Sequence, residues 1–241
     1  MAFSDVHSPL YTNEVLGLIE KHCAASGPDI IVVAGDIVDR GKWQAASYLE
    51  RINELCKPSY FIGVFGNDDF PEIREKIKEL TPSVKWLDDE NLGLTVKNLS
   101  FRIHGSTGIL DEPTNWQSKN IPNIREIYQK RLDNLKSFCE QSEDASINIV
   151  VMHYPPTYTT MLGEPSWAWK QMGSRKAEEI LVSLCKHGYV FHGHAHNSKR
   201  LLHTIGDITF INVAYPARKD VFFTLIKPKV SLDKYLLRDK Q

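Results

Sequence analysis

Acidic and imidazole side chains recur at five places along the chain, each just after a short apolar run. The stretches read "SDVH", "GDIVDRG", "GNDD", "MHYP" and "HGHAH". Together they offer the mixed oxygen and nitrogen donors that suit Zn, Mn, Fe, Co or Ni, whereas Ca²⁺ prefers oxygen alone. The candidate ligands are Asp5, His7, Asp36, Asn67, His153, His194 and His196. The pattern therefore predicts a transition-metal site.

No single motif carries this prediction. Asp5 and His7 alone are typical of a turn, Asp36 alone of a helix cap, and His153 alone of a core histidine. "GHAH" is more informative, because residues two apart in extended backbone face the same side. The combination, with every candidate at the end of an expected strand, is what indicates a metal site.

Buried strands must position these side chains. Apolar runs predict strands at Ile30–Ala34, Tyr60–Val64, Ile147–Met152 and Tyr189–Phe191, and a short first strand before Asp5. Continuous apolar runs are typical of strands covered on both faces. In open α/β sheets ligands gather at the carboxyl ends of the strands, so we expect the candidates to meet at one edge.

Helices are expected between these strands. Their alternation with strands over the first eighty residues predicts a mostly parallel sheet. Pro71 suits the first turn of a helix, and Ser174 suits an N-cap. The expected helices are 12–25, 42–55, 71–80, 124–138 and 174–186.

The middle and the tail have a different pattern. Leu92–Val96 and Ser100–His104 are expected as neighbouring strands, and Arg200–Val230 as antiparallel strands. Residues 105–122 and 154–173 are expected as long loops. There is no internal repeat or linker, so residues 1–241 are predicted to form one domain with two packed sheets and helices outside.

Composition excludes several classes. The 241-residue chain is 42% hydrophobic and 24% charged, which is typical of a globular protein. Its net charge of −1 argues against a nucleic-acid partner, because the chain offers no broad basic surface to neutralise a phosphate backbone. No apolar run approaches the roughly 20 residues of a membrane span.

The location is predicted from the N-terminus and the cysteines. Asp5 comes too early for a signal peptide to precede it. The cysteines are scattered without a CxxC pair and are interpreted as buried or incidental thiols in a reducing compartment. A soluble cytoplasmic protein is therefore expected. The cysteines are Cys23, Cys56, Cys139 and Cys185.

The five motifs, spanning Asp5 to His196, resemble those of the calcineurin-like metallophosphoesterases. That resemblance implies an α/β fold, a four-layer α/β/β/α sandwich of two mixed sheets flanked by helices. The phrases "HYPPTYTT" and "GSRKAEEIL" further resemble small prokaryotic members related to cyclic-nucleotide phosphodiesterases.

The resemblance also implies a partition of the ligands between two divalent ions, with Mn expected first and Fe, Zn, Co or Ni as alternatives. Two ions about 3.5–4 Å apart clamp an in-line phosphoryl displacement, and water bridging them becomes the attacking hydroxide. One ion is assigned Asp5, His7, Asp36 and His196, and the other Asp36, Asn67, His153 and His194.

The predicted function is hydrolysis of small-molecule phosphate mono- or diesters. A nuclease of the same superfamily and a non-catalytic scaffold are the alternatives. Asp36 would bridge the ions, and neutral Asn67 would add no charge where phosphate enters. Arg40 either pairs with substrate phosphate or forms an ion pair with Asp39 or Asp69. Asp39 and Asp69 either orient histidines or are plain turn carboxylates.

Asp68 stands where many relatives have a histidine. Beside two cations its pKa should fall, so it would give no general acid and the enzyme would favour good leaving groups. His104 and His192 match no ligand position and are expected to be structural. Four aromatics of the second loop either stack on a flat substrate group or pack the loop onto the body. These are Tyr154, Tyr158, Trp167 and Trp169.

Overall fold

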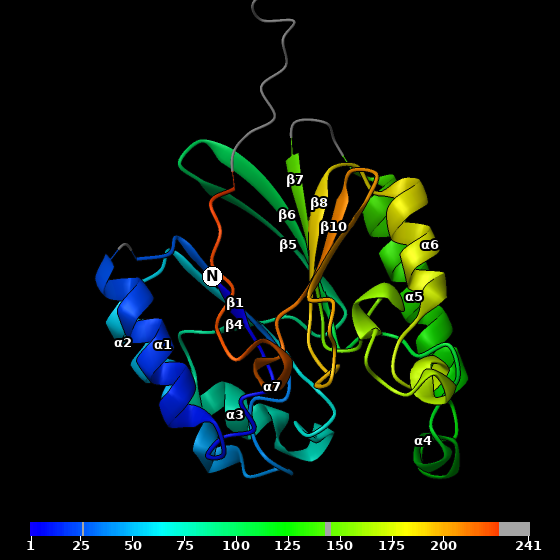
Figure 1. Ribbon diagram of the computed structural model, residues 1–241, viewed down its shortest axis with the longest axis horizontal. Helices are drawn as coiled ribbons and strands as arrows, with labels where there is room; N and C mark the ends of the chain where they lie inside the picture. Colours follow the sequence, from blue (N-terminus) through cyan, green and yellow to red (C-terminus); the bar gives the residue numbers. More distant parts are fainter. Residues whose placement is uncertain (26, 143–145, 227–241) are drawn as a thin grey trace, which may run out of the picture.

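The computed structural model describes residues 1–25, 27–142 and 146–226, and places two sheets face to face between helical layers (Figure 1). The first sheet has four strands in the order β1-β2-β3-β4, and every pairing between them is parallel. Its strands are β1 (Ala2–Phe3), β2 (Ile30–Ala34), β3 (Tyr60–Val64) and β4 (Lys85–Trp86).

The second sheet has six strands in the order β5-β6-β7-β8-β10-β9. The four central strands run parallel, and the two edge strands pair with them antiparallel. The sheet is therefore mixed. Its strands are β5 (Glu90–Val96), β6 (Leu99–Ser106), β7 (Ser146–Met152), β8 (Gly188–His192), β9 (Leu202–Ile205) and β10 (Ile208–Asn212).

Alternating side chains along a central strand pack into two different hydrophobic cores, one on each face of the sheet. In β7, Ile149 and Val151 belong to the apolar cluster between the sheets, together with Val32 and Ile62 of the first sheet. Val150, between them, joins the cluster beneath the outer helices. Both faces of the strand are thus covered, which is why its sequence is continuously apolar.

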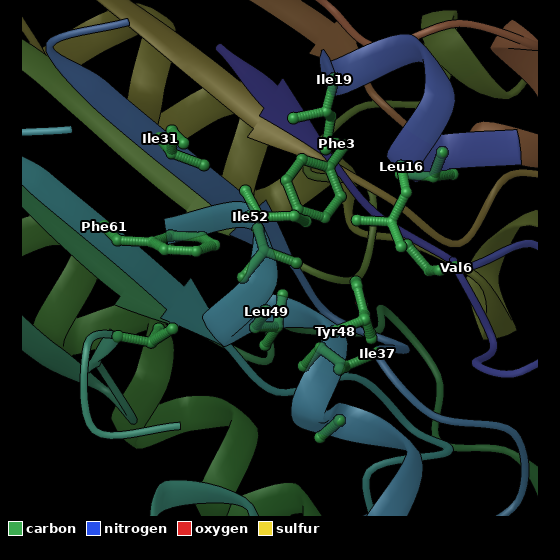
Figure 2. Close-up of a cluster of buried hydrophobic side chains, with 14 of the residues drawn as sticks. Phe3, Val6, Leu16, Ile19, Ile31, Ile37, Tyr48, Leu49, Ile52 and Phe61 are labelled. Atoms are coloured by element: carbon green, nitrogen blue, oxygen red, sulfur yellow. The ribbon is translucent and has the colours of Figure 1, made fainter. Parts of the chain in front are cut away.

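The outer face of the first sheet is covered by α1 (Thr12–Ala25), α2 (Tyr48–Cys56) and α3 (Arg74–Leu80). Figure 2 shows side chains of this cluster, with strand residues such as Phe3, Ile31 and Phe61 packed against helical residues. From the helices, Leu16 and Ile52 contribute. Burial of large apolar side chains here favours folding by about 1.5–3 kcal/mol each.

The second sheet is covered by α5 (Ile124–Glu140) and α6 (Arg175–Leu184), on the opposite side of the molecule from α1 and α2 (Figure 1). Ser174 caps α6, since its Oγ accepts a hydrogen bond of 3.2 Å from Ala177 N. The predicted four-layer α/β/β/α sandwich is confirmed. The observed sandwich differs from the predicted one only in the first sheet. That sheet was expected to be mixed, but all of its named strands pair in parallel.

Several elements differ from the sequence prediction. The expected helix 42–55 begins as a 3₁₀ helix, Trp43–Ser47, before α2. The expected loop 105–122 contains α4 (Asn115–Asn120), which begins with a capping box. In the tail, β9 and β10 pair antiparallel as expected, but α7 (Tyr215–Arg218) follows. Residues 227–230 of that prediction lie outside the described residues.

Three further 3₁₀ helices complete the elements, at Pro71–Ile73, Thr159–Met161 and Ser166–Gln171. Among the described residues, no helix combines the length and apolarity needed to cross a bilayer. The organisation of 1–241 as one domain stays a prediction.

The prediction of incidental thiols is wrong. Cys23 and Cys56 form a disulfide between α1 and the end of α2, and Cys139 and Cys185 form one between α5 and the end of α6. Sequence spacing gave no sign of this, because packed helices bring together residues 33 and 46 positions apart. Disulfides are rare in reducing compartments, so the cysteines no longer support the predicted cytoplasmic location.

Candidate metal centre

The predicted ligands lie where strands of both sheets end. Asp5 follows β1, Asp36 follows β2, and Asn67 follows β3. His153 follows β7 of the second sheet directly, and the "GHAH" loop follows β8. The centre therefore lies across the junction between the two sheets, at their carboxyl edge.

Six of the seven predicted ligands form two groups of three, with ligand atoms in each group within 4.8 Å of one another. We call them the outer triad and the inner triad. The outer triad is Asp5, His7 and His196, and the inner triad is Asp36, His153 and His194.

The outer triad is organised around a buried carboxylate. Asp5 Oδ1 lies 2.8 Å from His196 Nε2 and 4.0 Å from His7 Nε2. The backbone N–H of His194 donates to both Asp5 oxygens at 3.1 Å. The carboxylate thus faces two imidazoles while the backbone fixes its orientation.

The inner triad lies deeper. His153 Nε2 is 3.5 Å from Asp36 Oδ2 and 2.9 Å from Asn67 Oδ1. The ring of His194 stands edge-on to that of His153, with centroids 5.0 Å apart. Asn67, the seventh predicted ligand, is exposed at the rim of this triad.

Asp36 lies within reach of both triads. Its Oδ2 is 3.7 Å from His7 Nε2 as well as 3.5 Å from His153 Nε2. Its other oxygen accepts a 2.8 Å hydrogen bond from Asp68 N, which holds the carboxylate in place. This position suits the bridging role that the sequence assigned to it.

The donor atoms fit a metal ion. His7 Nε2 is buried, yet among the described residues it has no hydrogen-bond partner. It points at two carboxylates that lie 3.7 and 4.0 Å away, too far for hydrogen bonds. His153 Nδ1 is 3.1 Å from Ala34 O, so a hydrogen bond there leaves Nε2 facing the cluster. Both nitrogens are placed as metal ligands require.

The carboxylates of this centre perturb each other. Burial and the charge of Asp5 raise the pKa of Asp36 well above its usual range. Burial is the largest influence on the pKa of Asp5 and raises it, but the hydrogen bond from His196, the charges of His153 and His196 and the hydrogen bond from Ser4 together outweigh burial, so the net pKa is lowered. Two buried carboxylates this close favour the approach of a cation.

The histidines differ between the triads. Burial lowers the pKa of His7, but the nearby carboxylates of Asp68 and Asp36 raise it to about 9. In the inner triad burial dominates, and it lowers the pKa of His153 and takes that of His194 to about 3. The inner imidazoles are therefore neutral, the form in which histidine binds metals.

Backbone geometry at the centre is unusual. Four ligand positions have positive φ although none is glycine: Asp5 (56°), His7 (41°), Asp36 (49°) and His194 (67°). Such conformations cost free energy and cluster at functional sites. Two motif glycines permit close approach, because a Cβ on Gly66 would collide with the Asp36 carboxylate and one on Gly193 with that of Asp5.

The side chain of Asp69 binds backbone N–H groups rather than a histidine. It is fully buried and accepts hydrogen bonds from the N–H groups of Gly66 (2.8 Å), Ile37 (3.0 Å) and Val38 (3.2 Å). The prediction that Asp69 orients a histidine or is a plain turn carboxylate is wrong. It ties the loop after β2 to the loop after β3, a role that sequence spacing alone does not reveal.

The family model of the calcineurin-like phosphoesterases matches residues 1–198. The chain belongs to this family. Members are metal-dependent, and the two triads are the candidate metal-binding residues of this calcineurin-like phosphoesterase.

The fold is similar to two solved structures. Phosphopantetheinyl hydrolase from Mycobacterium tuberculosis has a TM-score of 0.61 and 16% identity, covering 95% of this chain and 96% of its own. A hypothetical protein from Thermus thermophilus has a TM-score of 0.52 and 13% identity, covering 99% and 83%. At these identities the likeness shows the fold alone. No curated protein matches the chain.

Arg40 lies outside both triads of this phosphoesterase. Its side chain is 85% exposed, and its Nε is 4.0 Å from Asp39 Oδ1. Asp39 pairs more closely with Lys42 Nζ, at 2.6 Å. Asp39 is thus a turn carboxylate rather than a partner of a histidine, and among the described residues the side chain of Arg40 has only this loose ion pair.

His104 and His192, which lie near the motifs but match no ligand position, are structural, as expected. His104 is buried with its Nδ1 2.8 Å from Asn91 Oδ1. His192 is buried with its Nε2 2.7 Å from Thr160 Oγ1. Neither belongs to a candidate metal group among the described residues.

The two long loops pack against each other. Asp111 N donates to Gly173 O at 3.0 Å, and Tyr158 OH donates to Asp111 at 2.6 Å. Tyr154 is buried, and Trp169 Nε1 donates to Glu164 O at 3.1 Å. Tyr154 thus packs the loop onto the body and Tyr158 ties it to the other loop, whereas Trp169 bonds within its own loop.

Trp167 is the exception among the loop aromatics, because it is 83% exposed. The same loop contacts the "GHAH" segment through Glu164, which accepts hydrogen bonds from Asn197 N (2.6 Å) and Nδ2 (3.0 Å). Asn197 directly follows His196, so this carboxylate braces a ligand loop. No spacing rule in the sequence pointed to Glu164.

Proposed function

We propose that this chain is a dinuclear metal-dependent phosphoesterase that hydrolyses small-molecule phosphate mono- or diesters. The observation that carries the proposal is the position of Asp36, whose Oδ2 lies within 3.7 Å of imidazole nitrogens from both triads. A single carboxylate between two ligand groups is what a pair of bridged ions requires.

Each residue has a role in this proposal. Asp5, His7 and His196 hold one ion, His153, His194 and Asn67 hold the other, and Asp36 belongs to both. Two bound divalent ions supply a nucleophile from water at neutral pH and neutralise charge in an in-line displacement. The amide of Asn67 adds no negative charge at the exposed rim, where phosphate enters.

Arg40 and Asp68 act at the substrate side. The exposed guanidinium of Arg40 binds a phosphate oxygen, a contact that its geometry favours. The pKa of Asp68 is lowered, first of all by its hydrogen bond with His7, so it stays ionised and provides no proton. The enzyme therefore prefers esters with good leaving groups, such as nitrophenyl phosphates.

Manganese is the metal that we propose first, with Fe, Zn, Co or Ni as alternatives. The test is hydrolysis of nitrophenyl phosphate and bis-nitrophenyl phosphate with Mn²⁺, then after chelation, then with Mn²⁺ restored. Activity should disappear with the chelator and return with the metal, and Asp36→Asn should lose about 10³-fold of it. Activity that survives complete metal removal would contradict the proposal.

The same assay separates the alternatives. Single-stranded DNA as the preferred substrate would indicate a nuclease, whereas metal binding without hydrolysis of any ester would indicate a scaffold. A panel of natural phosphate compounds then identifies the substrate. Location in the cytoplasm is a separate proposal, which fractionation of cells that produce the protein tests.

A further inference from the structure

Asp68 lies between two ligand loops. Its Oδ2 is 3.3 Å from His7 Nδ1 and 3.4 Å from Arg40 N, and its Oδ1 accepts from Asn67 Nδ2 at 3.1 Å. Its backbone is fixed as well, since Gly41 N donates to Asp68 O at 3.0 Å. The carboxylate is therefore held against the His7 ring by its surroundings.

The two nitrogens of His7 face different environments. Nδ1 faces the Asp68 carboxylate, whereas Nε2 faces Asp5 and Asp36 without a hydrogen bond. When a carboxylate accepts the proton of Nδ1, the lone pair of a neutral ring remains on Nε2. Ligating histidines in proteins are commonly oriented in this way.

His153 offers an internal comparison. Its Nδ1 is fixed by the backbone carbonyl of Ala34, 3.1 Å away, and its Nε2 faces the cluster. In the part of the chain that the structure describes, no carbonyl takes that place beside His7, and Asp68 occupies it. Each triad thus contains one imidazole whose far nitrogen is anchored, by backbone in one case and by a side chain in the other.

We propose that Asp68 is a positioning residue, which orients His7 so that Nε2 is presented to the metal ion of the outer triad. This inference rests on the metal centre of the proposed function and adds a role that none of the predicted ligands supplies.

Direct ligation by Asp68 is the competing explanation, because its oxygen lies within 4.8 Å of atoms of His7 and Asp36. The ring geometry argues against it. Nδ1 and Nε2 of an imidazole diverge, so an oxygen bound at Nδ1 points away from an ion that Nε2 binds. The two explanations predict different behaviour of an amide at this position.

The test is calorimetric titration of the metal-free full chain with Zn²⁺, for wild type, Asp68→Ala, Asp68→Asn and the control Asp39→Ala. Asp39→Ala removes a partly exposed carboxylate of the neighbouring turn. Asp68→Ala should weaken one of two Zn²⁺ sites by about 10- to 100-fold, the usual effect of losing such a partner. Asp68→Asn should stay within about threefold, because its amide oxygen accepts the same proton.

A second readout follows the proton itself. In Zn²⁺-loaded protein with ¹⁵N-labelled histidine, His7 should show a slowly exchanging Nδ1–H signal, assigned by its loss in His7→Gln. The signal should persist in Asp68→Asn and vanish in Asp68→Ala. Its absence from the wild type would overturn the proposal even if Asp68→Ala failed to fold.

Other outcomes of the Zn²⁺ titration would also decide between positioning and direct ligation by Asp68. Equal losses of Zn²⁺ affinity in Asp68→Ala and Asp68→Asn would indicate direct ligation, and unchanged affinity in Asp68→Ala would exclude any role in binding. A wild type that binds Zn²⁺ but hydrolyses no ester would defeat the proposed function and leave this test valid. A wild type that binds no Zn²⁺ would overturn both.

Discussion

The outer and inner triads are built from the same residue types, one aspartate and two histidines, but they differ in access to solvent. In the outer triad the side chains of His7 and His196 are 12% and 37% exposed. In the inner triad that of His153 is fully buried. The outer triad is therefore the more accessible of the two, although Asp5 of the outer triad is buried and His194 of the inner triad is partly exposed.

The triads also differ in the contacts that hold their ligand residues in place. The loops that carry Asp36 and Asn67 are tied together by Asp69 through three backbone N–H groups, all buried. The outer triad combines backbone contacts, from His194 N to both Asp5 oxygens, with the side-chain contact between Asp68 and His7. From this comparison we expect the inner site to be the more rigid and to exchange its ion more slowly than the outer site.

The largest effect is expected from Asp36→Asn, because this residue belongs to both sites. Hydrolysis should fall by about 10³-fold, roughly 4 kcal/mol of transition-state stabilisation, and both ions should bind poorly. His196→Ala should weaken the outer ion alone. Metal analysis under Mn²⁺ saturation separates the two, and an equal loss of one ion in both variants would reject the shared role.

The next effect concerns the order of metal loss. With a chelator, wild-type protein should release one ion quickly and the other slowly. His196→Ala should remove the fast phase, and His153→Ala the slow one, because burial limits access of the chelator. Stopped-flow release of Mn²⁺ measures both phases, and identical kinetics in the two variants would show that burial does not distinguish the triads.

A smaller effect is expected for Asp69→Asn. An amide cannot accept from all the N–H groups that now point at the carboxylate, so unfolding should become about 2–4 kcal/mol easier. Metal affinity should fall in the inner site before the outer one. Asp39→Asn, in the loop after β2 and partly exposed, should change stability by less than about 0.5 kcal/mol. Urea unfolding of the metal-free protein provides the measurement.

The smallest effect on the metal centre is expected from removing the disulfide between α5 and the end of α6. Replacing Cys139 and Cys185 by serine should lower stability by about 2–4 kcal/mol, because a loop of 46 residues loses its closure. Both ions should still bind with unchanged stoichiometry, since this disulfide lies behind the second sheet. Loss of either ion in that variant would show that the outer layer helps to shape the site.

Much of the fold could be predicted from the local pattern of apolar and polar residues in the sequence. The strands Ile30–Ala34 and Tyr60–Val64 were predicted with their observed ends, because apolar runs bounded by glycine and proline are unambiguous. The two-residue strand β4 was missed, since Lys85–Trp86 has no periodicity to detect. The parallel pairing of β10 with β8 was also missed, because pairing partners lie far apart in sequence.

The centre was predictable by residue type more than by geometry. Spacing and resemblance suggested the ligands, and the structure brings six of them into the two triads. The positive φ at Asp36 and the backbone partners of Asp69 were not predictable, because they arise only when loops from different strands pack. Those same contacts show Asp69 to be a loop clamp and place Asp68, not Asp39, beside a histidine.

The junction between the sheets has a consequence for folding kinetics. Asp5 and His196, which meet in the outer triad, are 191 positions apart in the chain. Contacts of such high sequence separation form late, because the loop between them must close first. The metal centre is thus expected to assemble only after the sheets have docked. A bound ion would then slow their separation, so metal-dependent unfolding rates would report on the junction itself.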